Sequence, residues 1–259
     1  MKTTTLRLIN TLAFIATVAV NALANLLPIG YGNTGEISAR YRDLFTPAPL
    51  TFGIWGVIYL MMLGFILYQW GLFGQRITAE NDVDTVGLAF AFSCAMNIGW
   101  IFAWHYDIQW LALLAIIGLL VTLWITIARL SNNERRGLAR FVTDTGFDLY
   151  FGWICAAVLA NVCVFLVSIG ISASGTAQEL RTIGMLALGT LIGAGLSASE
   201  GRRAATGSVM WAFTGILIRH IGREGFAAGY PAVIVTAALG LAVMLITLVR
   251  EREALPSPV

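Results

Sequence analysis

The segment PAPLTFGIWGVIY, residues 47–59, starts a long apolar stretch and places Trp55 and Tyr59 near its beginning. Trp55 and Tyr59 are four residues apart, so they lie on the same face if the stretch is helical. The stretch runs from residue 51 to residue 74 and is long and apolar enough to cross a bilayer. Polar atoms are poorly solvated at that depth, so the polar tips of these side chains indicate a functional role.

Eight apolar stretches of this kind occur along the chain, and charged or Gly/Pro-rich links separate them. We place them at residues 6–28, 51–74, 85–105, 109–130, 146–171, 181–199, 206–222 and 227–249. They are too long for barrel strands, and in a bilayer every backbone polar group must be bonded internally. We therefore expect an all-α polytopic bundle of about eight transmembrane helices. The sixth stretch is Gly-rich and the seventh ends in Arg219-His220, so a count of seven is the alternative.

Composition supports an integral membrane protein. Of 259 residues, 58% are hydrophobic and 12% are charged, which is about half the charged fraction of a soluble domain. The net charge of +2 is mild and its charges are scattered, so we expect membrane lipids and no nucleic acid as partners. The only lysine is Lys2, which excludes a retinal-binding opsin, because its Schiff base needs a lysine in an apolar helix.

Lysine and arginine are distributed unequally between alternate links. The 16 basic residues form a set of eleven on the side of the N-terminus and a set of five on the other side. The smaller set is Arg40, Arg42, Arg181, Arg219 and Arg223. By the positive-inside rule, we expect both termini in the cytoplasm and the chain in a bacterial inner membrane.

The third and fifth stretches repeat the combination of aromatic and amide side chains. Asn97, Trp100 and Trp104 follow one another at spacings of three and four, so they share one helical face. The fifth stretch carries Trp153 and Asn161. Such a face is suited to stack against a flat ligand while an amide or an indole N–H bonds a carbonyl or carboxylate. The alternative is that the aromatic side chains only fill the bundle core.

Other tryptophans and amides have simpler explanations. We assign Trp70 and Trp110 to the membrane–water interface. Asn21 and Asn161 are expected to join helices by hydrogen bonds. Asn25, one turn after Asn21 and near the end of the first stretch, fits either a helix contact or a ligand contact.

This ordered series resembles the TspO/MBR family, the tryptophan-rich sensory proteins. Residues 47–59 are similar to the start of the family's second helix, with its W-x-x-x-Y. Asn97-Ile98-Gly99-Trp100 is similar to N-x-x-W in its third helix. Trp153 and Asn161 are similar to residues of its fifth helix. The sequence departs from the family after Trp100, where the usual proline is missing.

The resemblance covers roughly residues 6–171 and implies a five-helix bundle with a cavity open toward the long first loop. It also implies a hydrophobic small-molecule ligand such as a porphyrin, a haem-like tetrapyrrole or a sterol. Residues 172–259 are expected to add three further transmembrane helices. We therefore interpret the protein as a membrane small-molecule binding or sensory protein. The expected ligand-binding residues are Asn25, Trp55, Tyr59, Asn97, Trp100, Trp104, Asp148 and Trp153.

Two further features each allow two interpretations: Asp148, and the link of residues 28–50. Asp148 is one turn inside the fifth stretch, beside Tyr150 and Trp153, where it either contacts the ligand or complements the helix dipole. The link is the longest one and is rich in Gly and Pro, so it is either a lid over the cavity or a tether.

Signals for chemistry are weak. His105 and His220 lie at stretch ends, and Cys94, Cys155 and Cys163 lack metal or redox spacing. We assign no catalytic residue and no metal, and only a porphyrin or haem ligand would be a cofactor. A secondary transporter completed by the three extra helices is the alternative function, and an enzyme acting on a tetrapyrrole is the third. Gly189-x-x-x-Gly193 predicts close helix packing, either within the chain or in a homodimer.

Overall fold

The computed structural model describes residues 2–27, 29–41, 43–131, 134–171 and 174–254. Within these ranges the chain is helical and has no strand. Its elements are α1 (Thr3–Leu26), α2 (Thr34–Arg40), the 3₁₀-helix η1 (Pro49–Gly53), α3 (Ile54–Gln69), α4 (Arg76–Val86), α5 (Ala89–His105), α6 (Gln109–Leu130), α7 (Gly137–Arg140), the π-helix η2 (Phe141–Thr145), α8 (Gly146–Ser168), α9 (Gly175–Glu200), α10 (Arg203–Ile221) and α11 (Pro231–Ala254).

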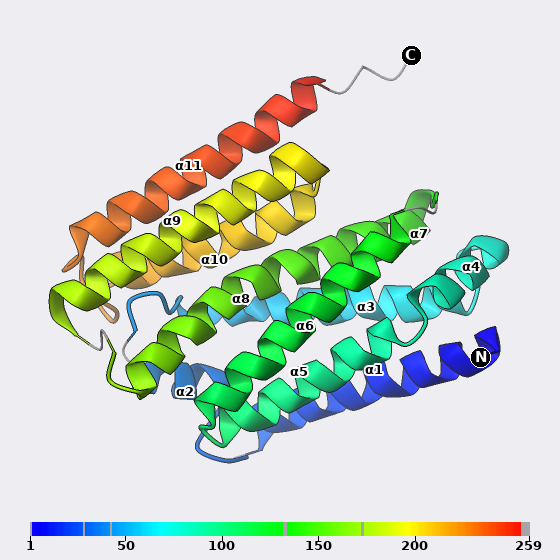
Figure 1. Cartoon of the computed structure of the whole chain (residues 1–259), viewed down its shortest axis with the longest axis horizontal. Coiled ribbons are helices and arrows are strands. Elements are labelled where there is room, and N and C mark those ends of the chain that lie inside the picture. The colour runs from blue at the N-terminus through cyan, green and yellow to red at the C-terminus, as the bar shows by residue number, and fades with distance from the viewer. Residues whose placement is uncertain (1, 28, 42, 132–133, 172–173, 255–259) are drawn as a thin grey trace.

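Five long helices form a closed ring in the order α1, α3, α8, α6 and α5, in which each helix packs against the next and α5 returns to α1. α10 packs on the outer side of α8, and α9 and α11 pack with α10 in a further layer (Figure 1). Two buried hydrophobic clusters follow this division. The larger one fills the ring, and the smaller one joins α8 to α9, α10 and α11.

The expected all-α polytopic bundle is confirmed, but the count of spans differs from the expected eight. In the described residues six helical segments are long and apolar enough to cross a membrane by themselves. α4 and α5 form a seventh as a pair bent by 59°. The bend is made at Gly87, whose φ of 58° is readily adopted only by glycine.

The stretch of residues 206–222 forms α10, as expected, but α10 is not among these apolar segments. Two of its polar side chains donate hydrogen bonds to neighbouring helices. The Thr206 hydroxyl donates to the Gly193 carbonyl at 2.7 Å, and the Ser208 hydroxyl donates to the Leu149 carbonyl at 2.7 Å. Polar side chains within a membrane protein are tolerated where they face neighbouring helices and are paired there. The start of α1 and the end of α11 lie toward the same end of the bundle (Figure 1).

Glycines allow close approaches between helices of the bundle. A Cβ at Gly152 of α8 would lie 2.1 Å from the Ala205 carbonyl oxygen of α10, so only glycine allows this contact. A Cβ at Gly193 of α9 would lie 2.4 Å from Met244 of α11, and one at Gly189 would lie 3.0 Å from Phe213 of α10. The Gly189-x-x-x-Gly193 face therefore packs within the chain.

Candidate functional site

The link after α1 forms a cap over one end of the bundle, and we call residues 29–53 the cap. Its first half is fixed to the turn between α5 and α6. The Tyr31 amide donates to the His105 carbonyl at 3.0 Å, and the Trp104 indole N–H donates to the Thr34 carbonyl at 3.1 Å. The His105 ring contacts Thr34 Oγ1 at 3.2 Å and the Ile29 carbonyl at 3.2 Å. His105 thus anchors the cap with both ring nitrogens.

The second half of the cap, residues 43–48, is buried between the ring and the C-terminal helices. The Ala48 amide donates to the Gly215 carbonyl at 2.9 Å, and the Trp211 indole donates to the Thr51 carbonyl at 2.9 Å. Because both halves are anchored, the cap is a fixed part of the fold and more than a tether. Pro28 and Arg42 of this link lie outside the described residues.

Beneath the cap, four aromatic rings from α3 and α5 form one continuous stack, which we call the aromatic column. Tyr59 stacks on Trp55 with ring centroids 5.6 Å apart and an interplanar angle of 24°. Trp55 stacks on Trp100 at 6.0 Å and 28°, and Trp100 on Trp104 at 5.7 Å and 26°. Offset stacking at these distances is a favourable arrangement of aromatic side chains. The column therefore joins the two helical faces that the sequence predicted separately.

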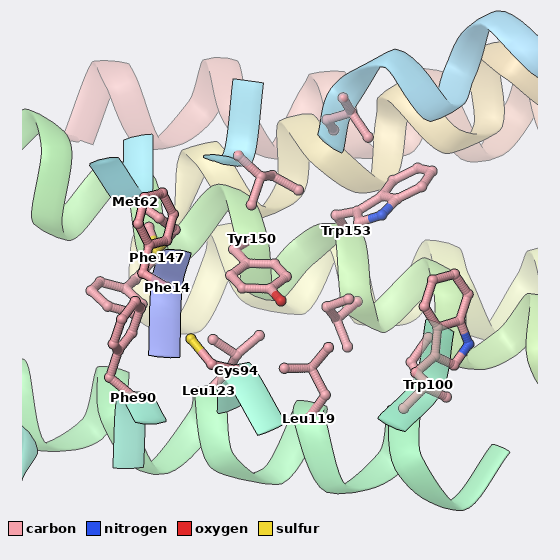
Figure 2. Close-up of a cluster of buried hydrophobic side chains, with 14 of the residues drawn as sticks. Phe14, Met62, Phe90, Cys94, Trp100, Leu119, Leu123, Phe147, Tyr150 and Trp153 are labelled. Carbon is pink, nitrogen blue, oxygen red and sulfur yellow. The ribbon is translucent and has the colours of Figure 1, made fainter. Parts of the chain in front are cut away.

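α8 adds rings that meet the column edge-on. Trp153 is 6.2 Å from Trp55 at 85°, and Tyr150 is 5.8 Å from Trp55 at 74°. In Figure 2, Trp100 and Trp153 lie at one end of the buried cluster, and Phe90, Phe147 and Met62 lie at the other end. The rings expected to bind the ligand are thus gathered at the cap end of the ring of helices.

Two cavities adjoin the column and share Trp55, Trp100 and Phe52 as walls. The first, the α1 pocket, has a volume of about 370 Å³ and is also lined by Val18, Asn21, Asn25, Thr34 and Tyr59. The second, the cap pocket, has a volume of about 40 Å³ and is also lined by Ser38, Phe45, Pro47, Trp104, Trp153 and Asn161. Ligand sites in proteins usually measure roughly 300–1,000 Å³, and of these two cavities the α1 pocket is of that size as it stands.

Buried amides connect the helices behind the column. The Asn21 amide donates to Asn97 Oδ1 at 2.8 Å, and the Asn97 amide donates to the Tyr150 hydroxyl at 2.8 Å. The Trp100 indole N–H donates to Asn161 Oδ1 at 3.0 Å. Asn97 lies beside the site and links α1, α5 and α8. Asn21 and Asn161 make the expected interhelical bonds.

Asn25 and Trp153 are placed where a ligand could meet them. Asn25 is exposed, lines the α1 pocket, and donates to the Asn21 carbonyl at 2.9 Å. Trp153 is only 3% exposed and lines the cap pocket, and its indole N–H has no hydrogen-bond partner among the described residues. A buried donor without a partner costs free energy, so this atom is a candidate contact for an acceptor on a ligand.

Asp148 is not brought together with the other predicted residues. It accepts a hydrogen bond from Arg202 at 2.7 Å in a separate polar pocket of about 120 Å³, which Arg135 and Asp144 also line. There Arg135 pairs with Asp82 at 2.7 Å and with Asp144 at 2.6 Å. No pattern along the sequence predicts these partly buried ion pairs, because their members are scattered over α4, the link before α7, η2, α8 and the link before α10.

The tryptophans assigned to the interface lie on the surface of the bundle. Trp70 is 40% exposed and Trp110 is 57% exposed. No pattern along the sequence predicts that Phe45, Pro47 and Phe52 line the site, because they do so only when the cap folds back over it. Within the described part of the chain, no group of three His, Cys, Asp or Glu side chains is arranged to hold a metal ion.

The six apolar segments and the bent pair make this chain a multi-pass integral membrane protein. It belongs to the TSPO-like protein family, whose sequence model matches residues 7–250. The matched region includes α9, α10 and most of α11 as well as the five-helix ring. Family membership indicates a membrane sensory or ligand-binding protein. No curated protein and no solved structure matches the chain.

Proposed function

We propose that the protein binds a flat, hydrophobic small molecule against the aromatic column and senses it within the membrane. The expected ligands are a porphyrin, a haem-like tetrapyrrole or a sterol. The observation that carries this proposal is the wall formed by Trp55 and Trp100, which faces both cavities. Aromatic side chains offer large, rigid contact areas to ring-shaped ligands.

The α1 pocket is the proposed site of first binding. It is mostly apolar, and Asn21, Asn25 and Thr34 supply a few polar groups at the end nearest the cap. This combination of an apolar wall and few polar groups is typical of small-molecule sites. The ligand would place its carbonyl, carboxylate or hydroxyl toward Asn25 and Thr34 and its ring system against Trp55 and Trp100.

Residues 1–171 would then carry the binding site, and residues 172–259 would support it.

The alternative function, transport, needs a path from the column to the polar pocket around Asp148. Phe147 packs edge to face on Phe65 and Phe90, and the three ring centroids lie 5.0 to 5.9 Å apart on that side. A transported substrate would have to displace these rings, so the closed packing favours binding over transport.

The proposal is tested by titrating the purified protein in lipid nanodiscs with haem, protoporphyrin and a sterol. A tetrapyrrole near the column should quench tryptophan emission saturably, and a sterol should compete with it. If none of the three saturates the folded protein, the ligand class is wrong. Flux of the same compounds into proteoliposomes would then test transport.

A further inference from the structure

The second half of the cap is held by the C-terminal helices. Asp43 forms an ion pair with Arg181 of α9, and both side chains are buried. His220 Nε2 of α10 donates to the Leu44 carbonyl at 2.9 Å, and the Ala48 amide donates to the Gly215 carbonyl of α10. Every one of these partners lies beyond residue 171.

Asp43 also shapes the segment that it anchors. Its Oδ1 accepts a hydrogen bond from the Phe45 amide at 2.8 Å, while Oδ2 faces Arg181. Arg219 of α10 reaches the Pro47 carbonyl at 3.4 Å. One carboxylate therefore fixes both the local turn of the cap and its attachment to α9.

This segment closes the cap pocket. Phe45 and Pro47 line that pocket, and Phe45 also belongs to the hydrophobic cluster of the C-terminal helices, beside Phe213 and Ile216. Ser38, from the half of the cap that is fixed to α5, lines the same pocket. The pocket thus lies where the two halves of the cap meet, and separating them would enlarge it.

The closed pocket is too small for a ligand, although it holds Trp104 and the unpartnered indole N–H of Trp153. A ligand that reaches these groups must displace residues 43–48. The ion pair is suited to control whether this segment opens. A buried ion pair contributes little net stability to the fold, whereas loss of one partner leaves an uncompensated buried charge and destabilises the closed cap. Burial raises the pKa of Asp43 above its ordinary value, although Arg181 acts in the opposite direction.

We propose that α9 and α10 form a latch for the cap: the Asp43–Arg181 pair holds residues 43–48 closed over the cap pocket, and its release exposes the Trp104 and Trp153 walls. The purpose of the latch rests on the proposed function, but its opening can be measured without a ligand. The probe is a thiol introduced as Ser38→Cys, which is buried in the cap pocket when the cap is closed.

The experiment measures the rate at which a water-soluble maleimide labels this thiol in nanodiscs, with labelling of the same variant without Ser38→Cys subtracted. The parent in this comparison is the chain whose only change is Ser38→Cys. Arg181→Gln should raise the rate at least about tenfold, because it removes the ion-pair partner of Asp43 while the carboxylate stays buried. The matched control is Arg76→Gln, which removes an arginine whose side chain is 78% exposed and paired with Glu80 at 3.5 Å. An exposed pair of this kind contributes little, so the control should label at the parent rate.

Two further measurements separate a latch from general loss of structure. Cys94, buried in the five-helix ring, should stay as protected in Arg181→Gln as in the parent chain. The double variant Asp43→Asn/Arg181→Gln leaves no stranded charge, so it should fold and label at a rate between the parent and the single variant. If Arg181→Gln does not fold, the double variant carries the test. Labelling at the parent rate, or equal exposure of Cys94, would overturn the latch even if a ligand binds.

Discussion

The indole rings of Trp55 and Trp100 stack on one another, with centroids 6.0 Å apart and planes inclined by 28°. The two residues come from different helices, α3 and α5, and each is the inner neighbour of a second ring, Tyr59 or Trp104. This contact converts two short aromatic faces into one wall between two cavities. The wall is the feature from which the binding predictions follow.

Trp100→Ala should weaken binding of the first ligand that saturates the protein by about one to two orders of magnitude, because truncation of a buried aromatic anchor typically costs a few kcal/mol. Trp70→Ala, at an exposed tryptophan of the same chain, should leave the affinity within about twofold. Both affinities are obtained by calorimetric titration. Trp100→Phe, which keeps a ring but loses the bond to Asn161, should retain most of the binding. Equal effects at Trp100 and Trp70 would contradict a ligand site at the column.

Val18→Phe should block the α1 pocket, because Val18 lines it and the added ring would occupy ligand volume. The folded state should be kept, since the ring enters an existing cavity and does not displace packed atoms. Ile15→Phe, on the same helix at a position that is 56% exposed, is the matched control and should bind normally. Normal ligand affinity in Val18→Phe would place the ligand elsewhere.

Asn97→Ala should destabilise the ring of helices rather than abolish a ligand contact. It removes the partner of both Asn21 and Tyr150 and leaves their polar atoms buried, at a cost of about 1–3 kcal/mol. A lower midpoint of thermal unfolding in detergent would show this. In a double-mutant cycle, Asn21→Ala should cost less in the Asn97→Ala background than in the parent chain. Additive effects would mean that the two amides do not interact.

The Tyr41 hydroxyl should ionise at a pH about two units higher than that of a free tyrosine. Burial, followed by its hydrogen bond and charge interaction with Asp107, raises the pKa of Tyr41 from 10.0 to about 12. A folded-state pKa above the unfolded value means that the bond stabilises the cap fully below pH 10 and is lost as the pH rises through about 12. The difference in phenolate absorbance between the parent chain and Tyr41→Phe measures this ionisation. A difference spectrum that titrates near pH 10 would contradict the bond.

The distribution of basic residues predicts that both termini are cytoplasmic. A thiol introduced as Ser131→Cys, on the same side as the termini, should be protected from a membrane-impermeant reagent in intact cells. A thiol introduced as Tyr31→Cys, in the cap and exposed on the structure, should react. The reverse pattern would invert the topology.

Sequence alone determined the local features. Apolar length located the long helices, although it counted α10 as a span. Helical spacing placed Trp55 with Tyr59 and Trp100 with Trp104 on common faces. These properties depend on residues within a few turns of one another. For the same reason the sequence allowed Asn25 and Asp148 to be grouped with the aromatic side chains, since each lies near the end of an apolar stretch.

Only the tertiary structure decided what these faces meet. It stacked the face of α3 on that of α5, and it paired Asp148 with Arg202 in a separate pocket. The tertiary structure also enclosed α10 between other helices, so that a segment with polar residues packs inside the bundle. It folded the cap against helices that lie more than a hundred residues further along the chain. The physical reason is that interhelical contacts arise from shape and from satisfaction of buried polar groups across the whole bundle, and no periodicity along the chain encodes them.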